Sequence, residues 1–126
     1  MAVVLVVEDH PANLKLARYV LEAAGHVVHA AENALDGLAM ADAEHPDVIC
    51  MDIQLPGMDG FEAIRRLRAN PSTRDIPIIA LTAYAMPADE AKMIAAGCQG
   101  YLAKPYRPAK LLETLAKAMN GAAPPR

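Results

Sequence analysis

The sequence predicts a doubly wound α/β domain, in which helices cover both faces of a parallel β-sheet. Short apolar runs of strand length alternate with longer segments whose apolar residues recur at helical spacing. The strand-like runs are continuously apolar, which is typical of strands that are buried on both faces. Helical connections between such strands favour right-handed crossovers. We therefore expect five parallel strands and five helices in a single domain.

In the first half of the chain the expected strands span residues 3–7, 27–30 and 47–51. The first helix is expected to begin near Pro11, a residue that suits a first helical turn, and to stop at Gly25. The second should begin after Asn33, whose side chain can cap it, and end at His45-Pro46. The apolar residues of the first helix are Leu14, Ala17, Val20, Leu21 and Ala24, and those expected to face inward in the second are Leu35, Leu38 and Ala39.

In the second half the expected strands span residues 76–81 and a short stretch near Tyr101 and Leu102. A helix over residues 59–70 is predicted by the cap residue Asp59 and by Glu62 three positions later. Another is expected over residues 87–96, closed by Gly97. The apolar stripe of a last helix consists of Leu111, Leu112, Leu115 and Met119.

Composition and charge exclude several classes of protein. The 126 residues are 54% hydrophobic and 21% charged, with a net charge of −3 and no cluster of Lys and Arg, so we expect no nucleic-acid partner. No leader or membrane segment is apparent, and Cys50 and Cys98 form no paired motif. We expect a cytoplasmic protein with reduced cysteines and no contact with a membrane.

Acidic, hydroxyl and ammonium groups follow the predicted strands. Glu8 and Asp9 come after the first strand, Asp52 after the third, Thr82 after the fourth and Lys104 after the fifth. The carboxyl ends of parallel strands meet at one edge of a sheet. Two carboxylates about 4 Å apart repel by roughly 4 kcal/mol at an effective dielectric constant near 20, so such a cluster favours a bound cation. Mg²⁺ prefers oxygen ligands, and Asp9 and Asp52 are the candidate direct ligands.

Each of these residues also has an ordinary interpretation. Glu8 and Asp9 can open a loop and stabilise the start of the helix at Pro11, Lys104 can be solvated, and Thr82 can bond nearby backbone. Their joint placement favours a phosphoryl-transfer site instead. In it Asp52 is the nucleophile, while Lys104 and Thr82 hold the remaining phosphoryl oxygens.

Four segments together resemble the receiver domains of bacterial response regulators. They are Glu8-Asp9, the stretch of residues 51–60 that contains Asp52, Leu81-Thr82-Ala83, and Lys104-Pro105. The resemblance covers nearly the whole chain and is strongest to stand-alone regulators of cell division. It implies a flavodoxin-like receiver fold, with a five-stranded parallel sheet in the order 2-1-3-4-5.

The resemblance also implies a role for each site residue. Asp52 would accept a phosphoryl group from a histidine kinase or a histidine phosphotransfer protein. Mg²⁺ would be bound by Asp9, Asp52 and the backbone carbonyl of Gln54, with Glu8 acting through water. Thr82 would bond the phosphoryl group and Lys104 would pair with it.

Further implied roles concern the surroundings of the phosphoryl group and the signal. Ala83 and Pro105 would line the phosphoryl pocket, with a cis bond before Pro105. Thr82 and Tyr101 would form the switch. Gln54 and Tyr84 would tune the lifetime of the acyl phosphate. Output would pass to a downstream protein through the face of helix 4, strand 5 and helix 5. Donors would dock on residues 11–18 and on the loop after Lys104.

For domain organisation we expect a receiver domain over residues 1–120, a flexible tail over 121–126 and no output domain. The protein would be a monomer or weak dimer, and would catalyse only its own phosphorylation and dephosphorylation.

Three other functions fit the sequence less well. A phosphatase of the haloacid-dehalogenase type needs a second Asp as general acid, where this chain has the amide of Gln54. A flavin-binding module needs a Gly-rich or hydroxyl-rich loop after the first strand, where this chain has Glu8 and Asp9. A receiver that acts as a scaffold without phosphate is disfavoured because every chemical position is filled.

Overall fold

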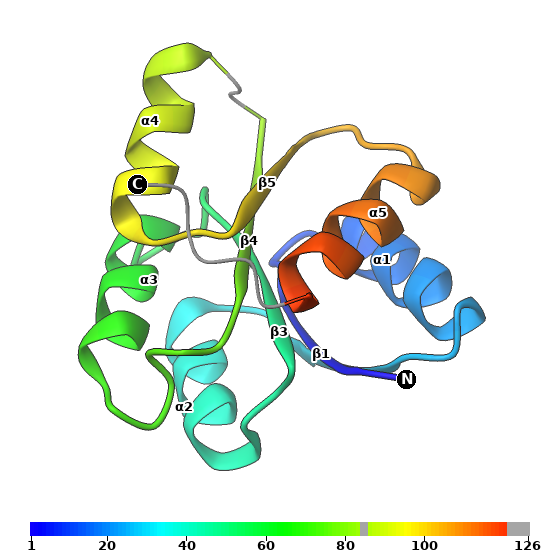
Figure 1. Cartoon of the computed structure of the whole chain (residues 1–126), viewed down its shortest axis with the longest axis horizontal. Coiled ribbons are helices and arrows are strands. Elements are labelled where there is room, and N and C mark those ends of the chain that lie inside the picture. Colours follow the sequence, from blue (N-terminus) through cyan, green and yellow to red (C-terminus); the bar gives the residue numbers. More distant parts are fainter. Residues whose placement is uncertain (84–85, 121–126) are drawn as a thin grey trace.

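A computed structural model describes residues 1–83 and 86–120 of the chain. Within these ranges, five strands and five helices alternate strictly (Figure 1). They are β1 (Val3–Val7), α1 (Pro11–Ala23), β2 (Val27–Ala31), α2 (Ala34–Glu44), β3 (Val48–Asp52), α3 (Gly60–Ala69), β4 (Ile78–Thr82), α4 (Pro87–Ala96), β5 (Gly100–Ala103) and α5 (Pro108–Met119). The predicted alternation is confirmed. The expected tail, residues 121–126, lies outside the described residues.

The strands form one parallel sheet in the order β2-β1-β3-β4-β5, as predicted. The register pairs Val7 with Met51, so β1 and β3 end side by side. It also pairs Thr82 with Ala103, which aligns the ends of β4 and β5. The residues that follow these strands therefore gather at one edge of the sheet.

Helices cover both faces of the sheet, as Figure 1 shows. Alternate residues of β1 supply the two cores, since Leu5 and Val7 belong to one buried cluster and Val4 and Val6 to the other. The first cluster lies beneath α2, α3 and α4, and the second beneath α1 and α5. Both sides of each central strand are thus buried, which explains the continuous apolar runs in the sequence.

The predicted inward face of α2 was partly wrong. Leu35 is 63% exposed and Ala39 is also exposed, whereas Leu38 is partly buried. The fully buried positions are Ala34, Gly37 and Ala41. A Cβ on Gly37 would lie 2.8 Å from a methyl carbon of Val7, so α2 packs too closely on β1 for a large side chain. Small residues therefore form the buried stripe of this helix.

Several element boundaries differ by one or two residues from the predictions. β4 begins at Ile78 instead of residue 76, because Pro77 has no backbone N–H to donate to a sheet. β3 extends to Asp52 itself. Ala24 is the C-cap of α1 and is exposed, so it does not continue the apolar face. None of the helices in the described ranges is long and apolar enough to cross a membrane.

Candidate functional site

The carboxyl edge of the sheet brings together the residues that the sequence singled out. Asp52 and Thr82 are the last residues of β3 and β4, and Lys104 directly follows β5. Glu8 follows β1 and donates its backbone N–H to the carbonyl oxygen of Ala31 at 3.0 Å, which continues the β1–β2 ladder by one residue. The side chains of Glu8, Asp52 and Thr82 are polar groups in a buried environment. Parallel strand ends therefore assemble this polar site from distant parts of the chain.

Three carboxylates form a compact acidic cluster. Glu8, Asp9 and Asp52 each offer one oxygen, and these oxygens all lie within 4.8 Å of one another. Glu8 and Asp52 are buried, whereas Asp9 is exposed and leaves one side of the cluster open to solvent. A set of hard oxygen donors with an open side fits an ion such as Mg²⁺, which keeps several water ligands. The cluster could hold a metal ion.

The ammonium group of Lys104 joins the two buried carboxylates. Its Nζ donates to Glu8 Oε1 at 2.7 Å and to Asp52 Oδ2 at 3.0 Å. The backbone N–H of Lys104 donates to the carbonyl oxygen of Thr82 at 2.7 Å, which extends the β4–β5 pairing to the site. Hydrogen bonds from both backbone and side chain therefore fix Lys104 beside Asp52.

The surroundings shift the pKa values of the two buried acids in opposite directions. Burial raises the pKa of Glu8, and its hydrogen bond with Asp52 raises it further. Burial also acts to raise the pKa of Asp52, but hydrogen bonds with Glu8, the Gln54 backbone and Lys104 outweigh it and lower that pKa. Burial opposes the charge of Lys104, yet its two carboxylate partners raise its pKa. Asp52 is thus an ionised carboxylate beside an ammonium group.

Gln54 orients Asp52 and links two loops of the site. Its backbone N–H donates to Asp52 Oδ1 at 2.8 Å. Its side-chain Oε1 accepts from the backbone N–H of Ala83 at 3.2 Å, so it connects the loop after β3 to the loop after β4. An amide in this position has no ionisable proton to give a leaving group, which agrees with the argument against a phosphatase.

The start of α3 supports the loop that follows Asp52. Asp59 caps the helix by accepting from the Glu62 N–H at 2.9 Å, as predicted. Gly60 donates its N–H to Ile53 O at 2.9 Å, and a Cβ on Gly60 would lie 2.6 Å from the carbonyl oxygen of Asp52. The sequence interpretation missed this close approach. A glycine directly after a predicted cap residue was the available signal.

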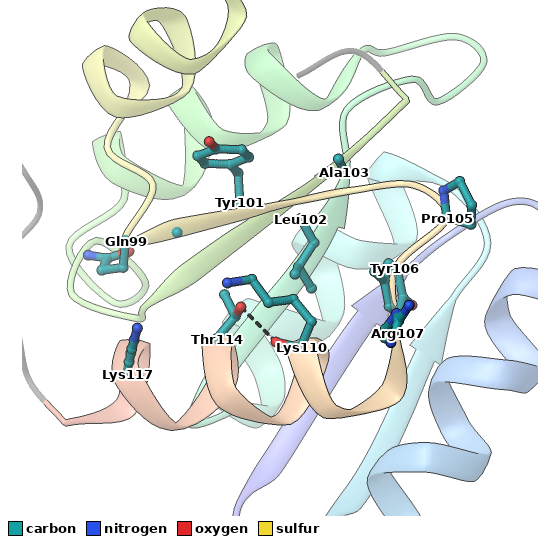
Figure 2. A pocket seen from close by; sticks show the side chains of 11 residues that line it. Gln99, Tyr101, Leu102, Ala103, Pro105, Tyr106, Arg107, Lys110, Thr114 and Lys117 are labelled. Carbon is teal, nitrogen blue, oxygen red and sulfur yellow. Dashed lines mark hydrogen bonds between the residues drawn. The ribbon is translucent and has the colours of Figure 1, made fainter. Parts of the chain in front are cut away.

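The remaining predicted residues lie around this centre. Ala83 and Pro105 are both exposed, and the bond before Pro105 is cis. Tyr101 is partly buried on β5, on the opposite side of that strand from α5 (Figure 2). Burial and a hydrogen bond with Glu90 raise the pKa of the Tyr101 hydroxyl. Tyr84 lies outside the described residues.

A family model of the response regulator receiver domain matches residues 4–116 of this chain. The chain belongs to the response regulator receiver family. It is therefore a receiver domain of two-component signalling, a class of proteins that generally transmit signals instead of turning over substrates. The predicted family and fold are confirmed.

Relatives and solved structures support the same assignment. The receiver domain is 39% identical over 119 residues to the polar-differentiation response regulator DivK of Brucella ovis, covering 94% of this chain and 97% of the relative. It is 34% identical to the chemotaxis protein CheY4 of Vibrio cholerae, with a TM-score of 0.89 over 94% of this chain and 98% of that one.

A third protein bears on the acidic cluster. The receiver domain of a Pseudomonas aeruginosa sensor histidine kinase is 35% identical, with a TM-score of 0.87 and coverage of 94% of this chain and 98% of that chain. That structure has a magnesium ion coordinated in its active-site cleft.

Proposed function

We propose that this receiver domain accepts a phosphoryl group on Asp52 from a histidine kinase or a histidine phosphotransfer protein, in a Mg²⁺-dependent reaction. The observation that carries the proposal is the placement of the Asp52 carboxylate between an acidic cluster and the Lys104 ammonium group. The lowered pKa of Asp52 supports an ionised nucleophile. No base is then needed to remove a proton from it.

The transfer exchanges one bond to phosphorus for another. An oxygen of Asp52 attacks the phosphorus of a phosphohistidine, the new O–P bond forms, and the N–P bond breaks with its electron pair left on the imidazole nitrogen. Lys104 and the Thr82 hydroxyl would bind the phosphoryl oxygens. Asp9, Asp52 and the backbone carbonyl of Gln54 would hold Mg²⁺, with Glu8 acting through water. The bound ion would offset the negative charge of the phosphoryl group.

The signal would leave through protein contacts on the face formed by α4, β5 and α5. Thr82 and Tyr101 would form the switch that links Asp52 to this face, because both lie on neighbouring strands of the sheet. Gln54 would tune the lifetime of the acyl phosphate through its bridge to Ala83. A tuning role for Tyr84 is part of the same proposal.

The phosphodonor would approach the open side of the site. That side is bordered by Asp9 and by the first turns of α1, so residues 11–18 and the loop after Lys104 would form the docking surface. We further propose that residues 1–120 form the receiver unit and that the protein works in the cytoplasm.

Intact mass after incubation with acetyl phosphate and Mg²⁺ tests the reaction. We expect one added phosphoryl group that is lost in Asp52→Asn and absent when EDTA replaces Mg²⁺. Asp75→Asn, which removes an exposed carboxylate far from the cluster, is the matched control and should be phosphorylated normally.

Asp9→Asn tests the role of the metal ion independently of the role of Asp52 as phosphoacceptor. It keeps the nucleophile but removes one metal ligand, so phosphorylation should need a higher Mg²⁺ concentration. Addition that survives in Asp52→Asn, or that proceeds equally in EDTA, would refute the proposed function.

A further inference from the structure

A groove runs between the last strand and the last helix. β5 is the edge strand of the sheet, and α5 packs beside it to form a hollow of about 630 Å³ (Figure 2). The aliphatic chain of Lys110 lies along this hollow. A terminal strand also has one row of backbone N–H and C=O groups that no neighbouring strand binds, and an extended segment of another protein can pair with such a row.

The charge of the groove is opposite to that of the whole chain. Arg107, Lys110 and Lys117 line it, and no Asp or Glu is among its lining residues, although the chain has a net charge of −3. Lys117 forms a salt bridge with Glu113 at 3.2 Å. Among the described residues, Arg107 and Lys110 form no such bridge. Glu113 interacts electrostatically with Lys110 as well as with Lys117. The positive charge available to a partner is therefore greatest at Arg107, with Lys110 on the adjoining first turn of α5.

A second copy of the chain is a poor occupant for this groove. Two edge strands that paired symmetrically would bring two sets of the same cations together, and like charges at an interface are unfavourable. An acidic segment would instead meet complementary charge. Its apolar residues could pack on the partly buried ring of Tyr106, which supplies uncharged lining beside Arg107.

We propose that the groove between β5 and α5 binds an acidic segment of a downstream protein. Carboxylates of that segment would pair with Arg107 and Lys110. The inference rests on the proposed function, because β5 and α5 belong to the face through which the signal is proposed to leave. Phosphorylation of Asp52 should therefore change the affinity of the groove for its partner.

Fluorescence anisotropy with a labelled peptide of alternating Glu and Leu tests the charge preference. A peptide of alternating Lys and Leu is the matched control and should bind more weakly. Arg107→Glu and Lys110→Glu should each weaken binding of the Glu peptide by about threefold to tenfold. Lys117→Glu should have a smaller effect, because Lys117 already pairs with Glu113.

Lys92→Glu is the control variant, since Lys92 is an exposed cation on α4 outside the groove. The proposal is overturned if Lys92→Glu weakens binding as much as Lys110→Glu does, or if both peptides bind equally. It is also overturned if vesicles of anionic lipid bind in an Arg107-dependent manner while the Glu peptide does not.

Parallel phosphorylation of the same samples separates the two proposals. If the unaltered protein binds the Glu peptide selectively but acetyl phosphate and Mg²⁺ do not phosphorylate Asp52, the proposed function is refuted and the proposed acidic partner stands. Normal phosphorylation, with no binding of the Glu peptide to either form, would refute the acidic partner alone.

Discussion

The side chain of Lys104 affects the pKa values of two buried carboxylates. Its ammonium group binds Glu8 and Asp52, both buried at the edge of the sheet. Burying a carboxylate without a partner is costly, whereas a paired and hydrogen-bonded carboxylate can persist. The stability of the metal-free protein and the ionisation of Asp52, its proposed acceptor, thus depend on the same contact.

Lys104→Met should destabilise the metal-free protein at neutral pH by about 3 kcal/mol, the lower end of the range for breaking a buried ion pair. The lower end applies because the Lys104 side chain retains 18% exposure. Urea unfolding in EDTA measures the change. Adding Glu8→Gln to this variant should restore part of the loss, and Lys15→Met on the exposed face of α1 should have little effect. A loss no larger than that of Lys15→Met would contradict this account.

Cys50 provides a test at alkaline pH. Burial raises the pKa of its thiol from an ordinary value of 9.0 to about 12. The unfolded chain therefore loses this proton first, and the free energy of unfolding should fall as the pH rises from 9 towards 12. Cys50→Val removes the titrating group, so its stability should fall less steeply over the same range. Parallel curves for the two proteins would show that the thiol is not protected from ionisation.

At the scale of whole elements, the beginning of α3 determines the position of the loop after Asp52. Gly60 contacts the backbone of Asp52 and Ile53, so the helix and the end of β3 are in direct main-chain contact. Asp59 holds the first turn in place through its cap. Small changes at the helix start should therefore be transmitted to Asp52, the proposed acceptor.

Gly60→Ala should destabilise the protein by about 1–3 kcal/mol, because its new methyl group would overlap the backbone of β3. Its phosphorylation by acetyl phosphate should also slow. Gly57→Ala is the matched control: Gly57 has a φ of +83° but open space around it, so this substitution should cost only about 1 kcal/mol of backbone strain. Equal effects of the two substitutions on phosphorylation would argue against the close contact at Gly60.

Sequence periodicity predicted every element but not every packing face. Continuous apolar strands and cap residues such as Asn33 and Asp59 are local signals, and the structure confirms both caps. The inward face of α2 was predicted wrongly at Leu35, because the close approach of α2 to β1 is a tertiary effect that hydrophobicity does not encode.

The partners of Arg68 are a second example of tertiary contacts that the sequence does not reveal, here for a polar residue. Its guanidinium donates to the backbone carbonyls of Gly97, Arg74 and Ile76 and to the side chain of Gln99. It thereby connects α3 to the segment after α4 and to the segment before β4. A helical Arg in the sequence gives no indication of such distant partners. The site residues were easier to predict, because strand ends in a parallel sheet always share an edge.

For the molecule as a whole, metal binding should be coupled to folding. The acidic cluster combines two residues that follow β1 with the last residue of β3, so it exists only in the native state. At a Mg²⁺ concentration about 100 times its dissociation constant, the free energy of unfolding should rise by about 2.7 kcal/mol. Urea unfolding at constant ionic strength measures this rise, which Asp9→Asn should reduce. An equal rise in that variant would point to Mg²⁺ acting elsewhere.

The span of the site along the chain has a consequence for biosynthesis. Lys104 binds a carboxylate 96 positions earlier in the sequence, and β5 is the last strand to be made. On the ribosome, Asp52 leaves the exit tunnel well before its ammonium partner does. Under the proposed function, a chain that ends before β5 would lack the Lys104 contact to Asp52, so it would not compete for the phosphodonor.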